Sequence, residues 1–353
     1  MADSSKPEQY YSVRILSYDP LITASACSDN VFIAMMVDDM PELFGTERGL
    51  HLLLPMWNVV EDGISADMRR ALDVAEKKMP GHSHLVLAST EYEAYILGTH
   101  GVPTFFSHQA IFIDENVWKP YQGQFFDLGR FDAVLNARFD RWKRHDLASS
   151  ISRLMLVYDY SLDEDIEKST RRMIATLPDA CFANRELRGE RYSKLKHEEI
   201  AQLYAHVDVG LCLSSSEGYC RASTEYMMCG LPVVSTNSTG GRDRYYANKY
   251  CRIVDANEAS IANAVQELKQ CNFPRSEVRK YLLDLLEFER HNFLRGFNRI
   301  VEQHFGIKDK FTSMKPFMNV KKEFLTHREL LKQLRNQYKD HARLEFSAFS
   351  PNE

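Results

Sequence analysis

The chain has 353 residues, of which 44% are apolar, and a formal net charge of −5 at pH 7. This length and composition suffice for the cores of about two domains and exclude an intrinsically disordered protein. The acidic balance argues against a general nucleic-acid binder, which would show a strongly basic surface.

The cysteines and the N-terminus predict where the chain resides. The seven cysteines include no Cys-x-x-Cys pair, so we expect free thiols in a reducing cytosol. The opening residues, MADSSKPEQYYSV, lack the apolar core of a secretory signal, and no stretch approaches the ~18 apolar residues of a membrane span. We therefore expect a cytoplasmic protein and leave open peripheral contact with the inner membrane face.

The first third of the chain alternates strand-like and helix-like runs. Helical spacing over 64–79 predicts a helix, and Thr90 with Glu93 forms a T-x-x-E capping box that opens another, ending at Gly101. Short apolar runs typical of strands occupy 13–19, 31–37, 50–57, 84–89 and 102–108. This alternation favours a parallel sheet covered by helices.

The rest of the chain repeats the α/β pattern and then becomes helical after about residue 258. Six strands are predicted at 131–137, 154–160, 180–187, 208–214, 231–236 and 250–255. We thus predict an N-terminal domain over 1–116, a linker over 117–130, a C-terminal domain over 131–300 and a helical tail over 301–353. Ligands of such doubly wound domains bind at the carboxyl ends of the strands.

Two glutamates follow the strand predicted at 208–214. Glu217 lies in the loop after it, and Glu225 lies on the short helix that Gly230 ends. The N-terminus of that helix attracts an anion such as a phosphate, and Gly218 allows close approach of the backbone. A carboxylate beside an anion site suits vicinal sugar or ribose hydroxyls, from which it accepts hydrogen bonds.

This segment, SSSEGYCRASTEYMMCGLPVVST, resembles the E-x7-E signature of retaining GT-B glycosyltransferases of family 4 and its relatives. The usual form is S-x-x-E-G-F-G followed by E-A-M-A-C-G-x-P-V-V. The chain departs from it at Cys220, where glycine is usual, and at Tyr226, where alanine is usual. The residues that match are Ser214, Glu217, Gly218, Tyr219, Glu225, Met227, Cys229, Gly230, Pro232, Val233 and Val234.

The resemblance implies a GT-B fold: two Rossmann-like doubly wound domains that face a cleft, the N-terminal one being small. It implies that Glu225 holds the ribose hydroxyls and that Glu217 contacts the donor hexose. Backbone near Gly218, Tyr219 and Cys220 would assist in binding the donor.

A second segment, VLNARFDRWKRHDL, resembles the family's G-R-L-x-x-x-K-G. Arg138 and Lys143 keep its spacing, while Ala137 and Arg144 stand where glycines are usual. In the family this pair neutralises the donor diphosphate, which gains charge as the glycosidic bond breaks. Such cations act without a metal, so no metal or other cofactor is expected.

Two further elements remain open between a structural and a functional role. The turn STGGRDRYY carries the family's glycines, with Gly241 a donor-binding candidate, but Arg244 stands where an acidic residue is usual. In the N-terminal domain, His108 is the candidate for the histidine that family members place against the donor hexose. Its competitors are His82, His84 and His100.

The triplet from Asp163 to Asp165 forms a D-x-D, the pattern that holds a metal in another glycosyltransferase fold. Because Ser161 and Glu164 spell a capping box, we interpret it as the start of a helix and expect no metal.

The sequence thus predicts a glycosyltransferase that moves a hexose, with retention and without a metal, from a UDP- or GDP-sugar to an acceptor hydroxyl. A glycan or lipid-linked acceptor is expected, as in glycan, polysaccharide or glycolipid synthesis. Two alternatives stay open: an epimerase or hydrolase of the same fold, and a catalytically silent sugar-nucleotide binding module.

Overall fold

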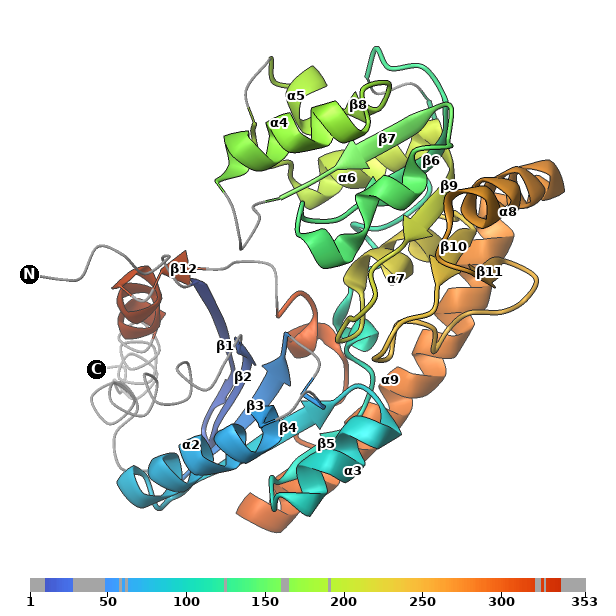
Figure 1. Ribbon diagram of the computed structural model, residues 1–353. Coiled ribbons are helices and arrows are strands. Elements are labelled where there is room, and N and C mark those ends of the chain that lie inside the picture. The colour runs from blue at the N-terminus through green and yellow to red at the C-terminus, as the bar shows by residue number, and fades with distance from the viewer. Residues whose placement is uncertain are drawn as a thin grey trace, which may run out of the picture. The chain divides into compact units, whose positions relative to one another are not determined.

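A computed structural model describes residues 10–27, 48–56, 59–60, 63–123, 126–159, 165–189, 192–320, 325–326 and 328–337. The chain divides into two compact units (Figure 1). Unit 1 comprises 1–112 and 290–353, and unit 2 comprises 113–289. The residues of the expected linker fall within unit 2, and those of the expected helical tail fall within unit 1.

Unit 1 is built on a six-stranded mixed sheet in the order β12-β1-β2-β3-β4-β5. The strands are β1 (Tyr10–Tyr18), β2 (Leu21–Cys27), β3 (Gly49–Pro55), β4 (His82–Ala88), β5 (Thr104–Phe106) and β12 (Leu325–Thr326). Strands β2 to β5 pair in parallel, whereas β1 is antiparallel to both β2 and β12. The predicted parallel pairing therefore holds from β2 to β5, and β1 and β12 add an antiparallel edge. The strand predicted at 31–37 lies outside the described residues.

Strand β2 was not predicted, because its sequence, LITASAC, is rich in small and hydroxyl-bearing residues. Thr23 and Ser25 are nonetheless buried. Thr23 Oγ1 is 2.9 Å from His51 Nδ1, so a hydrogen bond satisfies its hydroxyl inside the core.

Helices of unit 1 pack an apolar stripe against the sheet. Helix α2 (Ile64–Lys78) buries Met68, Leu72 and Ala75. Helix α3 (Glu91–Thr99) begins with the predicted capping box, which is confirmed: Glu93 N–H donates to Thr90 Oγ1 at 3.0 Å, and Thr90 N–H donates to the Glu93 carboxylate at 3.1 Å.

Three buried histidines lie together on β3 and β4. The Nε2 of His51 is 2.9 Å from Nδ1 of His82, and the rings of His51 and His84 are 5.1 Å apart. Burial lowers the pKa of His84 to about 4, with the charges of His82 and Arg69 adding to the effect. Burial also lowers the pKa of His51 well below its usual value, with His84 and His82 contributing. The folded unit therefore holds the imidazoles of His51 and His84 neutral.

We expect acid to destabilise the protein between pH 6.5 and about 4. Below pH 6.5 these histidines take up protons in the unfolded chain but not in the folded protein. The free energy of unfolding therefore falls by up to about 1.4 kcal/mol per pH unit for each histidine whose pKa is lowered. The melting temperature of the full chain, measured at a series of pH values across this range, reports the effect. His84→Leu should flatten the dependence, and an equally steep curve for this variant would contradict the assignment.

Unit 2 contains a six-stranded sheet in the order β11-β10-β9-β6-β7-β8, and every pair in it is parallel. Its strands are β6 (Phe131–Asn136), β7 (Leu154–Val157), β8 (Cys181–Phe182), β9 (Val207–Cys212), β10 (Val233–Thr236) and β11 (Cys251–Val254). All six coincide with predicted runs.

The run predicted as a strand at 180–187 is a strand only over β8, and the rest of that prediction was wrong. It continues as a short helix, α5 (Ala183–Glu186). Asn184 exchanges two hydrogen bonds with the backbone of Tyr158, at 3.0 and 3.1 Å. The side chain thereby satisfies the polar groups that a longer strand would have paired.

The remaining helices of unit 2 are α4 (Ile166–Thr176), α6 (His197–Leu203), α7 (Arg221–Met228) and α8 (Glu258–Cys271). Asp165 caps α4 by accepting the N–H groups of Glu167 and Lys168, so this acidic residue starts a helix as predicted. The N-cap is Asp165 itself, and the capping box predicted at Ser161 lies outside the described residues.

Helix α9 (Arg275–Phe305) begins in unit 2 and ends in unit 1. No helix within the described ranges is long and apolar enough to cross a membrane.

The order of the strands defines where unit 2 is able to bind a ligand. From β6 the chain moves to β7 and β8 on one side, and then returns to β9 on the other side of β6. Strands β6 and β9 therefore flank the topological switch point, outside whose carboxyl end a crevice forms in doubly wound sheets.

Candidate functional site

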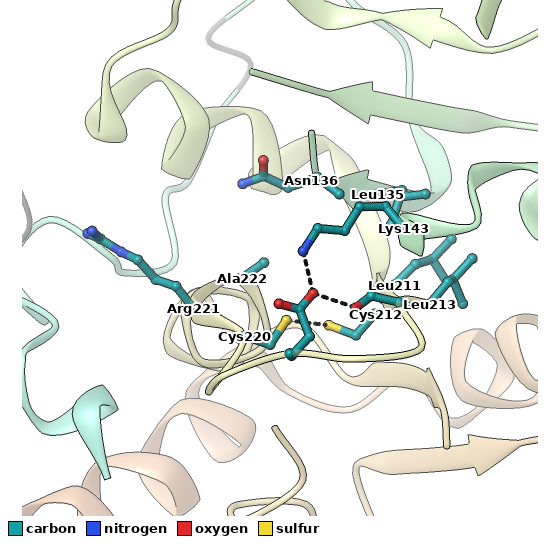
Figure 2. Close-up of a pocket in the computed structure, with 12 residues that line it drawn as sticks. Leu135, Asn136, Lys143, Leu211, Cys212, Leu213, Cys220, Arg221 and Ala222 are labelled. Atoms are coloured by element: carbon teal, nitrogen blue, oxygen red, sulfur yellow. Dashed lines mark hydrogen bonds and ion pairs between the residues drawn. The ribbon is translucent and has the colours of Figure 1, made fainter. Parts of the chain in front are cut away.

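A pocket lies at this switch point (Figure 2). Its walls come from the ends of β6 and β9, from Lys143 and Glu217 in the loops that follow them, and from the first turn of α7. Its volume of about 130 Å³ is below the ~300 Å³ of the smallest ordinary ligand sites. The pocket therefore has room for only part of a ligand of ordinary size.

Lys143 and Glu217 both line the pocket and form an ion pair there. Lys143 Nζ donates to Glu217 Oε1 at 2.6 Å, and Ser214 Oγ donates to the same oxygen. The Lys143 and Glu217 side chains are only 13% and 14% exposed. The structure thus brings together one residue from each of the two sequence motifs.

Arg138 lies outside the pocket lining. Its Nε is 2.9 Å from Oδ2 of Asp140, whose side chain is fully buried. Of the two cations expected to hold a diphosphate, Lys143 lines the pocket and Arg138 forms this ion pair. The role of Arg138 at a donor stays a prediction.

The glycine turn of the third motif packs under the Glu217 loop. Gly241 N–H donates to Gly218 O at 2.9 Å, and Glu217 N–H donates to Thr239 O at 3.1 Å. Gly240 has φ 98°, and a Cβ there would lie 1.7 Å from Glu217 O. Only glycine fits this position. The motif therefore holds the Glu217 loop, and contact of Gly241 with a donor stays a prediction.

Two arginines that the sequence did not single out tie together the strand ends behind the pocket. Arg144, with φ 50°, donates to Leu213 O at 2.5 Å and to Thr236 Oγ1 at 2.7 Å. Arg242, 2% exposed, donates to the Ser214 carbonyl at 3.0 Å and hydroxyl at 2.9 Å. The sequence did offer one indication of the unusual backbone at Arg144. The family usually has glycine at this position, and glycine is favoured where φ is positive.

Glu225 lies on the buried side of α7. It is 4% exposed, and Arg221 Nε donates to its Oε1 at 2.5 Å. Burial raises the pKa of Glu225, and the charge of Arg221 opposes that effect. Arg221 also lines the pocket, and nothing in the spacing of the motif had pointed to it. The ribose-binding role of Glu225 stays a prediction.

The large side chain at Tyr226 has a matching space in the core. A Cβ on Gly210, in β9, would lie 2.3 Å from the Tyr226 ring. The Tyr226 hydroxyl accepts the N–H of Asn136 at 2.7 Å, and the ring of Tyr204 packs 5.0 Å away. The glycine opposite explains how the chain accommodates tyrosine where alanine is usual.

Cys220 is the N-cap of α7 and has φ 49°. This left-handed conformation explains why glycine is usual at the position. Its Sγ is 3.9 Å from Sγ of Cys212, at the end of β9. The neighbouring Tyr219 is buried, and contact of either residue with a donor stays a prediction.

His108 belongs to unit 1 and is 1% exposed. Its Nδ1 accepts the N–H of Ala110 at 3.3 Å. Of its competitors, His82 and His84 belong to the buried histidine cluster, and His100 Nδ1 lies 3.1 Å from Ile96 O. A catalytic role for His108 stays a prediction. Among the described residues, no group of three or more His, Cys, Asp or Glu is arranged to hold a metal.

One segment of the chain matches a known family model. Residues 190–282 match the model of Glycosyl transferases group 1; this region contains Glu217, Glu225 and all of α7. A search among curated proteins gives no match.

Solved structures are similar to the chain at low sequence identity. Anabaena HepE in complex with UDP is 17% identical over 72% of this chain and 71% of its own, with a TM-score of 0.52. A glycosyltransferase from Rickettsia africae is 13% identical over 77% of this chain and 82% of its own, also with a TM-score of 0.52. Sucrose-phosphate synthase from Thermosynechococcus elongatus is 17% identical over 73% and 68%, with a TM-score of 0.50. The predicted two-domain α/β fold of GT-B type is confirmed.

Proposed function

We propose that the chain is a glycosyltransferase that moves a hexose from a nucleotide diphosphate sugar to an acceptor hydroxyl with retention and without a metal. The observation that carries this proposal is the Lys143–Glu217 pair in a pocket at the switch point of unit 2. The match of residues 190–282 to a glycosyltransferase family supports it. A UDP-sugar is the favoured donor, because the similar HepE structure contains UDP.

Lys143 is suited to bind the diphosphate while it keeps its ion pair with Glu217. An ammonium group has three N–H donors; one is directed at Glu217 Oε1, which leaves two for phosphate oxygens. The N-terminal turn of α7 lines the same pocket and adds the positive end of a helix dipole. Together they would stabilise the charge that develops on the leaving nucleoside diphosphate.

Glu217 is suited to bind hydroxyls of the donor hexose. Lys143 and Ser214 both donate to its Oε1, which fixes the direction of the carboxylate. A fixed carboxylate accepts hydrogen bonds from sugar hydroxyls. In this proposal the leaving phosphate takes the proton of the acceptor, and sugar transfer requires no protein nucleophile.

Calorimetric titration with UDP, GDP, ADP and their sugar conjugates, in the presence of EDTA, tests the proposal. We expect one nucleotide to bind with a dissociation constant on the order of micromolar. Release of free sugar without an acceptor would identify a hydrolase instead, and an isomerised sugar an epimerase. If none of the nucleotides binds, the proposal fails.

Glu225→Ala is expected to weaken nucleotide binding about tenfold to a hundredfold, since a hydrogen bond to a charged group contributes roughly 1.5–3 kcal/mol. The measurement is the dissociation constant of UDP. Because the variant also leaves Arg221 without its carboxylate, Arg221→Leu is the matched control. If Arg221→Leu weakens UDP as much as Glu225→Ala, the ion pair, not a ribose contact, accounts for the loss.

A further inference from the structure

Two thiols face each other in the wall of the donor pocket. Cys212 ends β9 and Cys220 caps α7, and their sulfur atoms are 3.9 Å apart. Figure 2 shows the side chains of Cys212 and Cys220 pointing toward one another. Both residues line the pocket, so a small oxidant that enters it reaches them.

We propose that Cys212 and Cys220 are an oxidation site, at which a peroxide converts the two thiols into an intramolecular disulfide that closes the pocket to nucleotide. The effect on nucleotide rests on the proposed function, whereas formation of the disulfide does not.

The chemistry assigns a different role to each sulfur. The Cys220 thiolate attacks one oxygen of the peroxide, which breaks the O–O bond, forms a sulfenic acid and releases hydroxide, which takes up the proton that the Cys220 thiol gave up and becomes water. Cys212 then attacks the Cys220 sulfur, forms the S–S bond and releases the second water. The two thiols lose two electrons in all, and hydrogen peroxide gains them. An attacking thiolate and a nearby resolving thiol are the requirements for this sequence.

The surroundings favour Cys220 as the attacking thiol. The side-chain hydrogen bond between Cys220 and Cys212 lowers the pKa of Cys220, and the charges of Arg242 and Lys143 act in the same direction, against burial and Glu217. Cys220 also stands at the N-terminus of α7, where the helix dipole stabilises a thiolate. Burial raises the pKa of Cys212, which keeps this sulfur protonated until it resolves the sulfenic acid.

Closing the bond changes the pocket wall. The sulfurs must approach from 3.9 Å to the S–S length of about 2.05 Å, which draws Cys220 toward β9. Cys220 connects the loop of Glu217 to α7, and Gly241 N–H anchors that loop at Gly218 O. The displacement therefore falls on the first turn of α7, the segment proposed to face the diphosphate.

The test compares the full chain after treatment with hydrogen peroxide and after reduction with dithiothreitol. Peptide mapping by mass spectrometry should find a Cys212–Cys220 cross-link that is lighter by two hydrogens than the reduced pair. The oxidised protein should bind UDP at least about tenfold more weakly, and reduction should restore the affinity.

Matched variants separate the pair from general oxidation damage. Cys220→Gly, which suits the positive φ, and Cys212→Ala should each lose the response to peroxide. Cys271→Ser, which removes an exposed thiol at the end of α8, should keep it.

Three results would overturn the proposal: no cross-linked peptide, a cross-link to another cysteine, or a Cys212–Cys220 cross-link with unchanged UDP affinity. Absence of UDP binding in the reduced protein would instead refute the proposed function, and peptide mapping would still decide whether the disulfide forms.

Discussion

Glu217→Gln is expected to lower the turnover number about 10²–10³-fold, the loss typical of removing one preorganised electrostatic contact at a reacting centre. The amide retains the size of the carboxylate but loses the charge that pairs with Lys143 and that would bind hexose hydroxyls. The affinity for free UDP, which lacks the hexose, should stay the same or rise, because Lys143 becomes available to the diphosphate. Steady-state kinetics with a UDP-sugar and calorimetry with UDP measure the two effects.

Lys143→Met is the matched control for this prediction. The variant removes the cation itself, so it should weaken UDP binding and lower turnover together. If the Glu217→Gln variant has the same turnover number as the unaltered protein, Glu217 takes no part in the reaction. Equal melting temperatures would exclude misfolding as the cause of either loss.

Tyr226→Ala is expected to lower the free energy of unfolding by about 3–5 kcal/mol, the range for deleting a large buried aromatic ring. The ring is fully buried, and its hydroxyl accepts the N–H of Asn136 at 2.7 Å. The substitution leaves both a cavity beside Tyr204 and an unpaired backbone donor at the end of β6. Urea denaturation followed by circular dichroism measures the change.

Two companion variants test the cause of that loss. Tyr226→Phe retains the ring and removes only the hydroxyl, so it should cost about 1 kcal/mol. Gly210→Ala alone should destabilise strongly, since its Cβ would lie 2.3 Å from the Tyr226 ring, and it should cost less together with Tyr226→Ala, which leaves only the Cβ of residue 226 at 2.9 Å. Additive effects of these two substitutions would show that the glycine and the ring do not depend on one another.

The regular elements of unit 2 were predictable because its strands are continuous apolar runs separated by helical spacing. Strands were missed or made too long where contacts between distant residues, and not the local apolar pattern, decide the structure. Strand β2 is buried although Thr23 and Ser25 are polar, because its place inside the sheet and the hydrogen bond to His51 compensate. At Asn184, one side chain bonded to the backbone of Tyr158 ends a strand that composition alone would have extended.

The candidate site was predictable to the extent that its residues lie in local motifs. Glu217 and Lys143 were singled out from such motifs, and they meet although 74 positions separate them. Arg144 and Arg242 were missed because their contacts depend on which strand ends lie next to one another in the folded sheet. Arg144 reaches Thr236 across 92 positions, a distance over which residue spacing carries no information.

The discontinuity of unit 1 constrains the order in which the chain folds during synthesis. Unit 2 is one uninterrupted segment, 113–289, whereas unit 1 needs both 1–112 and 290–353. Strand β1 pairs with β2 early, but its second antiparallel neighbour, β12, is available only when Leu325 and Thr326 have left the ribosome. Domains generally fold as units and in the order in which they leave the ribosome. In this chain all residues of unit 2 are synthesised before those of unit 1 are complete, and β1 keeps one unpaired edge until β12 is synthesised.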